Sequence, residues 1–319
     1  MTTRHFRTPF FLALLSLLTL AACKSETKHS DSMEEQALEA VAPVVEVVTR
    51  SMEFYAPDTL PSGWNHIAYK NQSTEPHFIL LDKYPEGKSI ADTRAEVLPP
   101  FDEGMALIME GKGEAAMAAF GKLPAWFSEI VYYGGTGLIS PGGTARSTVK
   151  LDPGYYIMEC YVKMPDGSWH TSMGMAKELI VKDEDSNLTP PEATVSVSVS
   201  GSEGYNMTGN PVAGKNVFAV TYADQMVHEN FVGHDLNLVR LDGDTDEDAL
   251  EVWMNWSVPN GLMSSTVPEG VTFLGGANDA PAGTTHYFEA ELTPGRYAFI
   301  AEVPDTRKKN LFLSFIVGE

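Results

Sequence analysis

The chain has 319 residues, of which 43 are acidic and 22 are basic, so its formal net charge at pH 7 is −21. A surface this acidic repels the phosphate backbone, which argues against nucleic acid as a partner. The length is greater than that of an average single domain and favours two domains.

The N-terminus predicts export and a lipid anchor. Residues 1–22 carry two arginines and no acidic residue, followed by an apolar run from Phe10 to Leu20. This run is about half the ~20 residues that a membrane-spanning helix needs, so residues 1–22 are expected to be a secretory signal. Leu20-Ala21-Ala22-Cys23 resembles the lipobox of bacterial lipoproteins. The resemblance implies that Cys23 is diacylated and holds the protein on a membrane of the cell envelope. Lys24 in place of an aspartate favours the periplasmic face of the outer membrane.

Residues 23–43 are polar and are expected to form a lipidated tether. Short runs rich in β-forming residues then begin, separated by Gly, Pro and Asp clusters; they are residues 44–48, 66–70, 77–81, 155–162 and 178–181. This pattern predicts a β-sandwich domain over residues 44–183. Between Ser89 and Phe127, Ala, Met and Glu recur at helical spacing and predict a helical insertion in that domain.

The second half of the chain repeats the first. Gly134-Gly135 precedes Asp152-Pro153-Gly154 by the same distance that separates Gly275-Gly276 from Thr293-Pro294-Gly295. An internal duplication explains this spacing. We therefore expect a linker over residues 184–191 and a second sandwich domain over residues 192–319.

Four side chains of the first domain suit a copper ion. Cys160 is followed by His170 and Met175, and His77 lies one β-segment earlier. A thiolate, two imidazoles and a thioether form the soft and borderline ligand set that copper prefers. If Cys23 carries lipid, Cys160 is also a single thiol in an oxidising compartment, where a thiol is expected to be buried or bound to metal.

These residues resemble the cupredoxin family. Tyr156 to Cys160 resembles its Tyr-x-x-x-Cys strand, Asn71 to His77 its segment of Asn, short turn and Pro-His, and His170 to Met175 its closing His-x4-Met. The resemblance implies an all-β protein with two Greek-key cupredoxin-like sandwiches in tandem. It also implies one type-1 copper ion in the first domain, held by His77, Cys160 and His170 with Met175 as the axial ligand.

The second domain is expected to be a degenerate copy. Carried over to it, the resemblance places His234 at the position of His77 and Ala301 at the position of Cys160. No copper is expected there.

The resulting expectation is a membrane-anchored electron-transfer protein of the cell envelope. Its partner would be another redox protein, such as a cytochrome or a copper enzyme. Glu159 and Tyr161 flank Cys160 where copper enzymes of this family carry a histidine, so no enzymatic activity is expected. Two alternatives remain open: a copper-handling lipoprotein that stores or delivers Cu(I), and a metal-free sandwich that binds a protein or a glycan.

Overall fold

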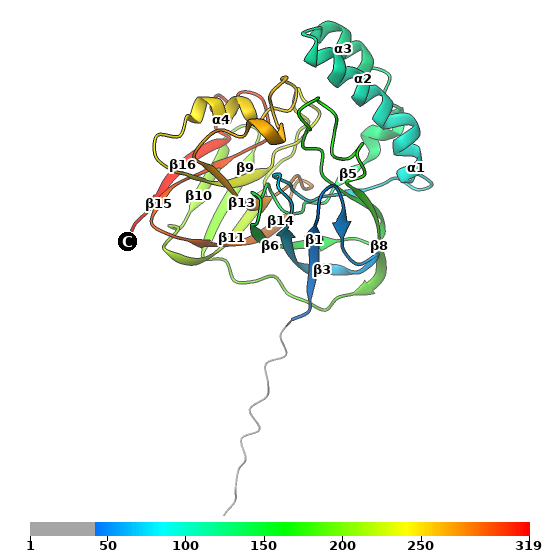
Figure 1. Cartoon of the computed structure of the whole chain (residues 1–319). Coiled ribbons are helices and arrows are strands. Elements are labelled where there is room, and N and C mark those ends of the chain that lie inside the picture. Colours follow the sequence, from blue (N-terminus) through cyan, green and yellow to red (C-terminus); the bar gives the residue numbers. More distant parts are fainter. Residues whose placement is uncertain (1–41) are drawn as a thin grey trace, which may run out of the picture. The chain divides into compact units, whose positions relative to one another are not determined.

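Strands dominate residues 42–319, the part of the chain that the computed structural model describes (Figure 1). The predicted signal over residues 1–22, the lipid on Cys23 and all but the end of the tether over residues 23–43 lie outside the described residues. Within residues 42–319, no helix combines the length and the apolar character that crossing a membrane requires.

The first half forms a sandwich in which strand β3 belongs to both sheets. Residues 59–62 of β3 pair with β8, and residues 63–70 pair with β6. One sheet contains β1 (Val44–Thr49), β2 (Phe54–Tyr55), β3 (Thr59–Asn71) and β6 (Thr144–Leu151). The other adds β4 (Leu80–Lys83), β5 (Val131–Tyr132), β7 (Gly154–Glu159) and β8 (Ala176–Asp185) to the start of β3.

The second half has the same plan. One sheet contains β9 (Val195–Ser200), β10 (Gly204–Thr208), β11 (Gly214–Tyr222) and β14 (Thr285–Leu292). The other contains β12 (Leu236–Leu241), β13 (Val271–Ala277), β15 (Gly295–Ile300) and β16 (Phe312–Val317). The parallel pair β9 and β11 corresponds to the parallel pair β1 and β3. Strands β6 and β14 pair antiparallel and join the two halves.

Repeated hydrogen bonds show the duplication at the level of single atoms. The Tyr156 hydroxyl donates to the Asp152 carbonyl, and the Tyr297 hydroxyl donates to the Thr293 carbonyl, both at 2.9 Å. The all-β fold with two sandwiches in tandem is therefore confirmed. The boundaries at residues 184 and 191 stay predictions, since residues 42–319 form one compact unit.

The predicted helical insertion is present between β4 and β5. It consists of α1 (Ile90–Asp92), a π-helical turn (Thr93–Val97), α2 (Leu98–Met109), α3 (Gly113–Phe120) and a 3-10 helix (Ala125–Glu129). It begins where Ser89 and Asp92 form a capping box, which satisfies the free N–H groups of the first turn. Figure 1 shows α2 and α3 at one end of the first sandwich. The second half carries α4 (Glu247–Trp253) and a 3-10 helix (Ser264–Thr266).

Two predicted strands are shorter than expected, and neither includes the candidate ligand next to it. The run over residues 77–81 forms a strand only from Leu80, and His77 makes a single bridge to Ile139. The run over residues 155–162 leaves its strand after Glu159. The backbone departs from regular pairing at these points because it turns to bring His77 and Cys160 together.

Candidate metal centre

Three of the four predicted ligands meet at one end of the first sandwich. His77 precedes β4, Cys160 follows β7, and His170 lies in the loop between β7 and β8. All three side chains are fully buried. Two backbone hydrogen bonds with Ile139, at 3.2 and 2.8 Å, fix the position of His77.

Backbone hydrogen bonds close the loop that carries His170. The Cys160 N–H donates to the Met175 carbonyl at 3.2 Å, which continues the pairing of β7 with β8. The His170 N–H donates to the Val162 carbonyl, and the Met175 N–H donates to the His170 carbonyl, both at 2.9 Å. The loop is therefore tied at both ends and across its middle, so His170 is held beside Cys160.

The three ligand atoms form a compact triangle. Cys160 Sγ lies 3.6 Å from His77 Nδ1 and 3.8 Å from His170 Nδ1, and the two nitrogens lie 3.1 Å apart. A circle through these three atoms has a radius of about 2.0 Å, close to the roughly 2.0–2.3 Å of nitrogen and sulfur bonds to a divalent transition metal. Within the described part of the chain, this is the group of His, Cys, Asp and Glu side chains arranged closely enough to hold a metal ion.

Burial keeps the three ligands neutral in the absence of a metal. It lowers the pKa of His77 to about 4, and burial together with the neighbouring His77 lowers the pKa of His170 to about 3. Burial raises the pKa of the Cys160 thiol to about 12, although backbone hydrogen bonds from Phe78 and Val162 oppose that rise. Imidazole nitrogens are thus free to bind at neutral pH, and a metal cation would displace the thiol proton.

The segment before His77 supplies the surrounding contacts. Asn71 Nδ2 donates to the Glu75 carbonyl at 2.7 Å and to the Ile139 carbonyl at 3.1 Å, which fixes the turn that leads to His77. Glu75 Oε2 lies 3.0 Å from His170 Nε2. Both imidazoles direct Nδ1 toward Cys160, and the Glu75 carboxylate lies near the other nitrogen of His170 without a hydrogen bond between them. Sequence reasoning missed Glu75, although it lies inside the turn that resembles cupredoxins.

Met175 is buried. Its carbonyl accepts the Cys160 N–H, so its backbone lies beside that of Cys160. Its role as the axial ligand stays a prediction. In the second half, His234 is buried and its Nδ1 lies 2.9 Å from His228 Nε2, while its Nε2 lies 3.0 Å from Asp224 Oδ1. Ala301 is buried at the position predicted to correspond to Cys160.

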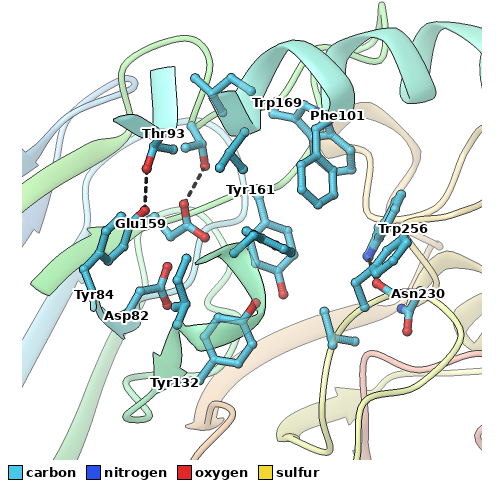
Figure 2. Close-up of a pocket in the computed structure, with 17 residues that line it drawn as sticks. Asp82, Tyr84, Thr93, Phe101, Tyr132, Glu159, Tyr161, Trp169, Asn230 and Trp256 are labelled. Carbon is cyan, nitrogen blue, oxygen red and sulfur yellow. Dashed lines mark hydrogen bonds between the residues drawn. The ribbon is translucent and has the colours of Figure 1, made fainter. Parts of the chain in front are cut away.

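A cavity that sequence reasoning also missed lies against the residues flanking the trio. It has a volume of about 80 Å³, and Figure 2 shows its lining. Glu159 and Tyr161 flank Cys160, and Trp169 and Thr171 flank His170; all four line the cavity. Strands β4 and β5, the helical insertion and the second half of the chain supply the rest of the wall, so a pattern within one segment could not reveal it.

Comparisons with known proteins give matches among solved structures alone, since no family model and no curated protein matches the chain. Reduced auracyanin from Roseiflexus castenholzii is 22% identical, with a TM-score of 0.26, over 43% of this chain and 94% of its own. Auracyanin A from Chloroflexus aurantiacus, described as a blue copper protein, is 21% identical, with a TM-score of 0.27, over 44% of this chain and 98% of its own. The copper-containing nitrite reductase of Thermus scotoductus is 12% identical, with a TM-score of 0.21, over 86% of this chain and 60% of its own.

The two-sandwich fold described above rests on the strand order and registers of this chain. The expectation that the chain has no enzymatic activity is nevertheless contradicted by these comparisons. Matches over 86% of the chain include two multicopper oxidases and a nitrite reductase, which are enzymes. The expectation rested on Glu159 and Tyr161, whose identity excludes only a histidine bridge from Cys160 to a second copper ion.

Proposed function

We propose that the protein binds one copper ion through His77, Cys160 and His170, with Met175 as a weak axial ligand, and uses it for single-electron redox chemistry. The observation that carries this proposal is the triangle of Cys160 Sγ and the two Nδ1 atoms, whose radius suits a metal ion. A cysteine and two histidines in a trigonal arrangement with a distant methionine are the ligand set of blue copper sites.

The chain's own residues prepare the site for this chemistry. All three ligands and Met175 are fully buried, which excludes water from the ligand positions. Pairing of β7 with β4 and with β8 fixes the backbone that leads into Cys160. Copper bound there would cycle between Cu(I) and Cu(II). Because the ligands cannot move far, little reorganisation would accompany each electron, and Cys160 would provide the most covalent route for it.

The partner and location belong to the same proposal. A protein with a net charge of −21 favours encounter with a basic redox partner, for which a cytochrome or a copper enzyme is suitable. Diacylated Cys23 would hold the sandwich domains at a membrane of the cell envelope, where such partners are found.

An optical spectrum of the purified protein tests the copper site. Cu(II) is added, excess is removed, and the visible thiolate-to-copper band and the bound copper are measured. An intense band with about one copper per chain is expected, and Cys160→Ala should abolish it. His66→Ala serves as the matched control, since His66 lies on β3 and contacts Thr148 at 2.8 Å, away from the trio. Absence of both band and bound copper would contradict the proposal and favour a metal-free binding module.

Copper handling is the second candidate, and one observation favours it. Met173, three residues after His170, is 55% exposed, and an exposed thioether is a suitable ligand for Cu(I) at the surface. Repeated reduction and oxidation in the presence of a Cu(I) chelator separates the two functions. A redox protein should keep its copper through the cycles. A delivery protein should lose its copper to the chelator, and the wild type should lose it faster than the Met173→Ala variant.

A further inference from the structure

The cavity beside the metal centre contains a pair of carboxyl groups that have no cationic partner. Asp82, on β4, is 2% exposed, and its Oδ1 has no hydrogen-bond partner among the described residues. Glu159, at the end of β7, lies beside Asp82 on the neighbouring strand, and both side chains line the cavity. Among the described residues neither carboxyl forms an ion pair with a Lys, Arg or His, and Glu159 Oε2 has only the Thr171 hydroxyl at 3.5 Å. A buried carboxyl group either keeps its proton or is matched by a cation, so this pair would accept a cation that entered the cavity.

The remainder of the cavity is predominantly aromatic and aliphatic. Figure 2 shows Asp82 and Glu159 at one side of the lining, Tyr161 near its middle, and Phe101 and Trp256 at the other side. The aliphatic wall comes from Val97, Leu98, Ile130 and Val232. A bare metal ion needs several oxygen ligands at close range, and apolar side chains supply none. The volume of about 80 Å³ exceeds the 10–15 Å³ or so that a single water molecule requires.

We propose that this cavity binds a small organic cation, a primary ammonium ion with a short apolar tail. The ammonium group would donate hydrogen bonds to Asp82 Oδ1 and to Glu159, and the tail would pack against the aromatic wall. Such charge-assisted hydrogen bonds are stronger than neutral ones, and aromatic rings attract an adjacent cation through their negative faces. The proposal does not require copper, because the cavity and the carboxyl pair are formed by the chain alone.

Calorimetric titration of the purified, metal-free protein with propylammonium chloride tests the site, with 1-propanol as the uncharged analogue of equal size. Propylammonium is expected to bind and to change the fluorescence of Trp169 and Trp256, which line the cavity. Propanol should bind at least about tenfold more weakly, since it lacks the charge. Equal binding of the two probes, or no binding of propylammonium, would overturn the proposal. Binding of Mg²⁺ in place of propylammonium would do the same.

Three variants locate the site. Asp82→Asn keeps the size of the side chain and should weaken propylammonium binding by about tenfold or more, whereas Glu184→Gln, an exposed carboxylate on β8, should not. Val97→Phe should also weaken binding, because it fills the cavity while both carboxyls remain. Undiminished propylammonium binding in either Asp82→Asn or Val97→Phe would overturn the proposal. One folded variant is therefore enough for the test. Cys160→Ala should bind propylammonium normally, so the copper proposal and this one can fail separately.

Discussion

Cys160 Sγ and His77 Nδ1 lie 3.6 Å apart although 83 residues separate the two side chains in the sequence. The whole helical insertion and strand β6 lie between them in the chain. Antiparallel pairing of β4 with β7, in which Leu80 faces Glu159, brings them together. The proximity of these two side chains is thus a consequence of one strand pairing, extended past its last regular residue on both sides.

The carboxylate of Glu75 should strengthen copper binding through His170. Its Oε2 lies 3.0 Å from His170 Nε2, the nitrogen that points away from Cys160. Partners of this kind orient a ligating imidazole, and their loss typically costs 10–100-fold in metal affinity. We expect Glu75→Gln to lower copper affinity by about tenfold, measured by competition with a chelator. Glu184→Gln is the control, and equal affinities of the two variants would contradict this role of Glu75.

The clustering of Cys160, His170 and His77 could be predicted from the sequence because it depends on residue types at fixed places in a strand and a loop. Cys160, His170 and His77 were named from their order and spacing, and the structure brings them together. The strand ends were harder to predict, since β-forming residues continue through Val162 while the backbone leaves the sheet after Glu159. A hydrophobic pattern indicates which residues are buried. Cys160 and Val162 are buried although the hydrogen-bonded strand has already ended at Glu159.

The cavity could not be predicted because its walls come from distant parts of the chain. Asp82 and Glu159 come from paired strands, Phe101 from α2, and Trp256 from the segment after α4. Neither carboxylate has a motif around it that distinguishes it from a surface residue. Their significance depends on burial and on the lack of a cation nearby, and both are properties of the folded chain.

The two repeated tyrosines should stabilise the two halves to different extents. Tyr156 and Tyr297 each donate to the carbonyl four residues earlier, but the Tyr297 hydroxyl also accepts from the Thr293 N–H at 3.2 Å and from Arg240 Nη1 at 3.1 Å. A single such hydrogen bond contributes about 1 kcal/mol. We expect Tyr156→Phe to lower the free energy of unfolding by about 1 kcal/mol and Tyr297→Phe by more. Urea denaturation measures both, and a larger loss in Tyr156→Phe would contradict this order.

Asp279 should make the stability of the metal-free protein depend on pH. Burial raises the pKa of Asp279 to about 7, so the folded state keeps a proton that the unfolded state releases above pH 3.8. The resulting stabilisation is fully present below pH 3.8 and is lost as the pH rises to about 7. Asn at this position resembles the protonated acid and does not titrate.

The difference in unfolding free energy between Asp279→Asn and the wild type should therefore increase from pH 5 to pH 8. Each pKa unit corresponds to about 1.4 kcal/mol, so the two units between pH 5 and the folded-state pKa give an expected increase of about 3 kcal/mol. Urea denaturation at the two pH values measures it, with the exposed Asp183→Asn as the control. A difference that stays constant with pH would show that Asp279 titrates normally in the folded state.

Lys163 should hold the two halves of the chain together. Its side chain is fully buried, and Nζ donates to the carbonyls of Trp256, Val258 and Pro259 at 2.8, 2.7 and 3.3 Å. Met has a similar length but no donor, so Lys163→Met would leave these carbonyls without their partner. A buried acceptor that loses its hydrogen bond costs about 1–3 kcal/mol. We expect a loss of about 2–4 kcal/mol in the free energy of unfolding, measured with urea against the exposed Lys150→Met.

Because the three carbonyls belong to the second half and Lys163 follows Cys160 by three residues, the variant should also release bound copper faster. A variant as stable as Lys150→Met would mean that water satisfies these carbonyls and that the two halves are held by β6 and β14 instead.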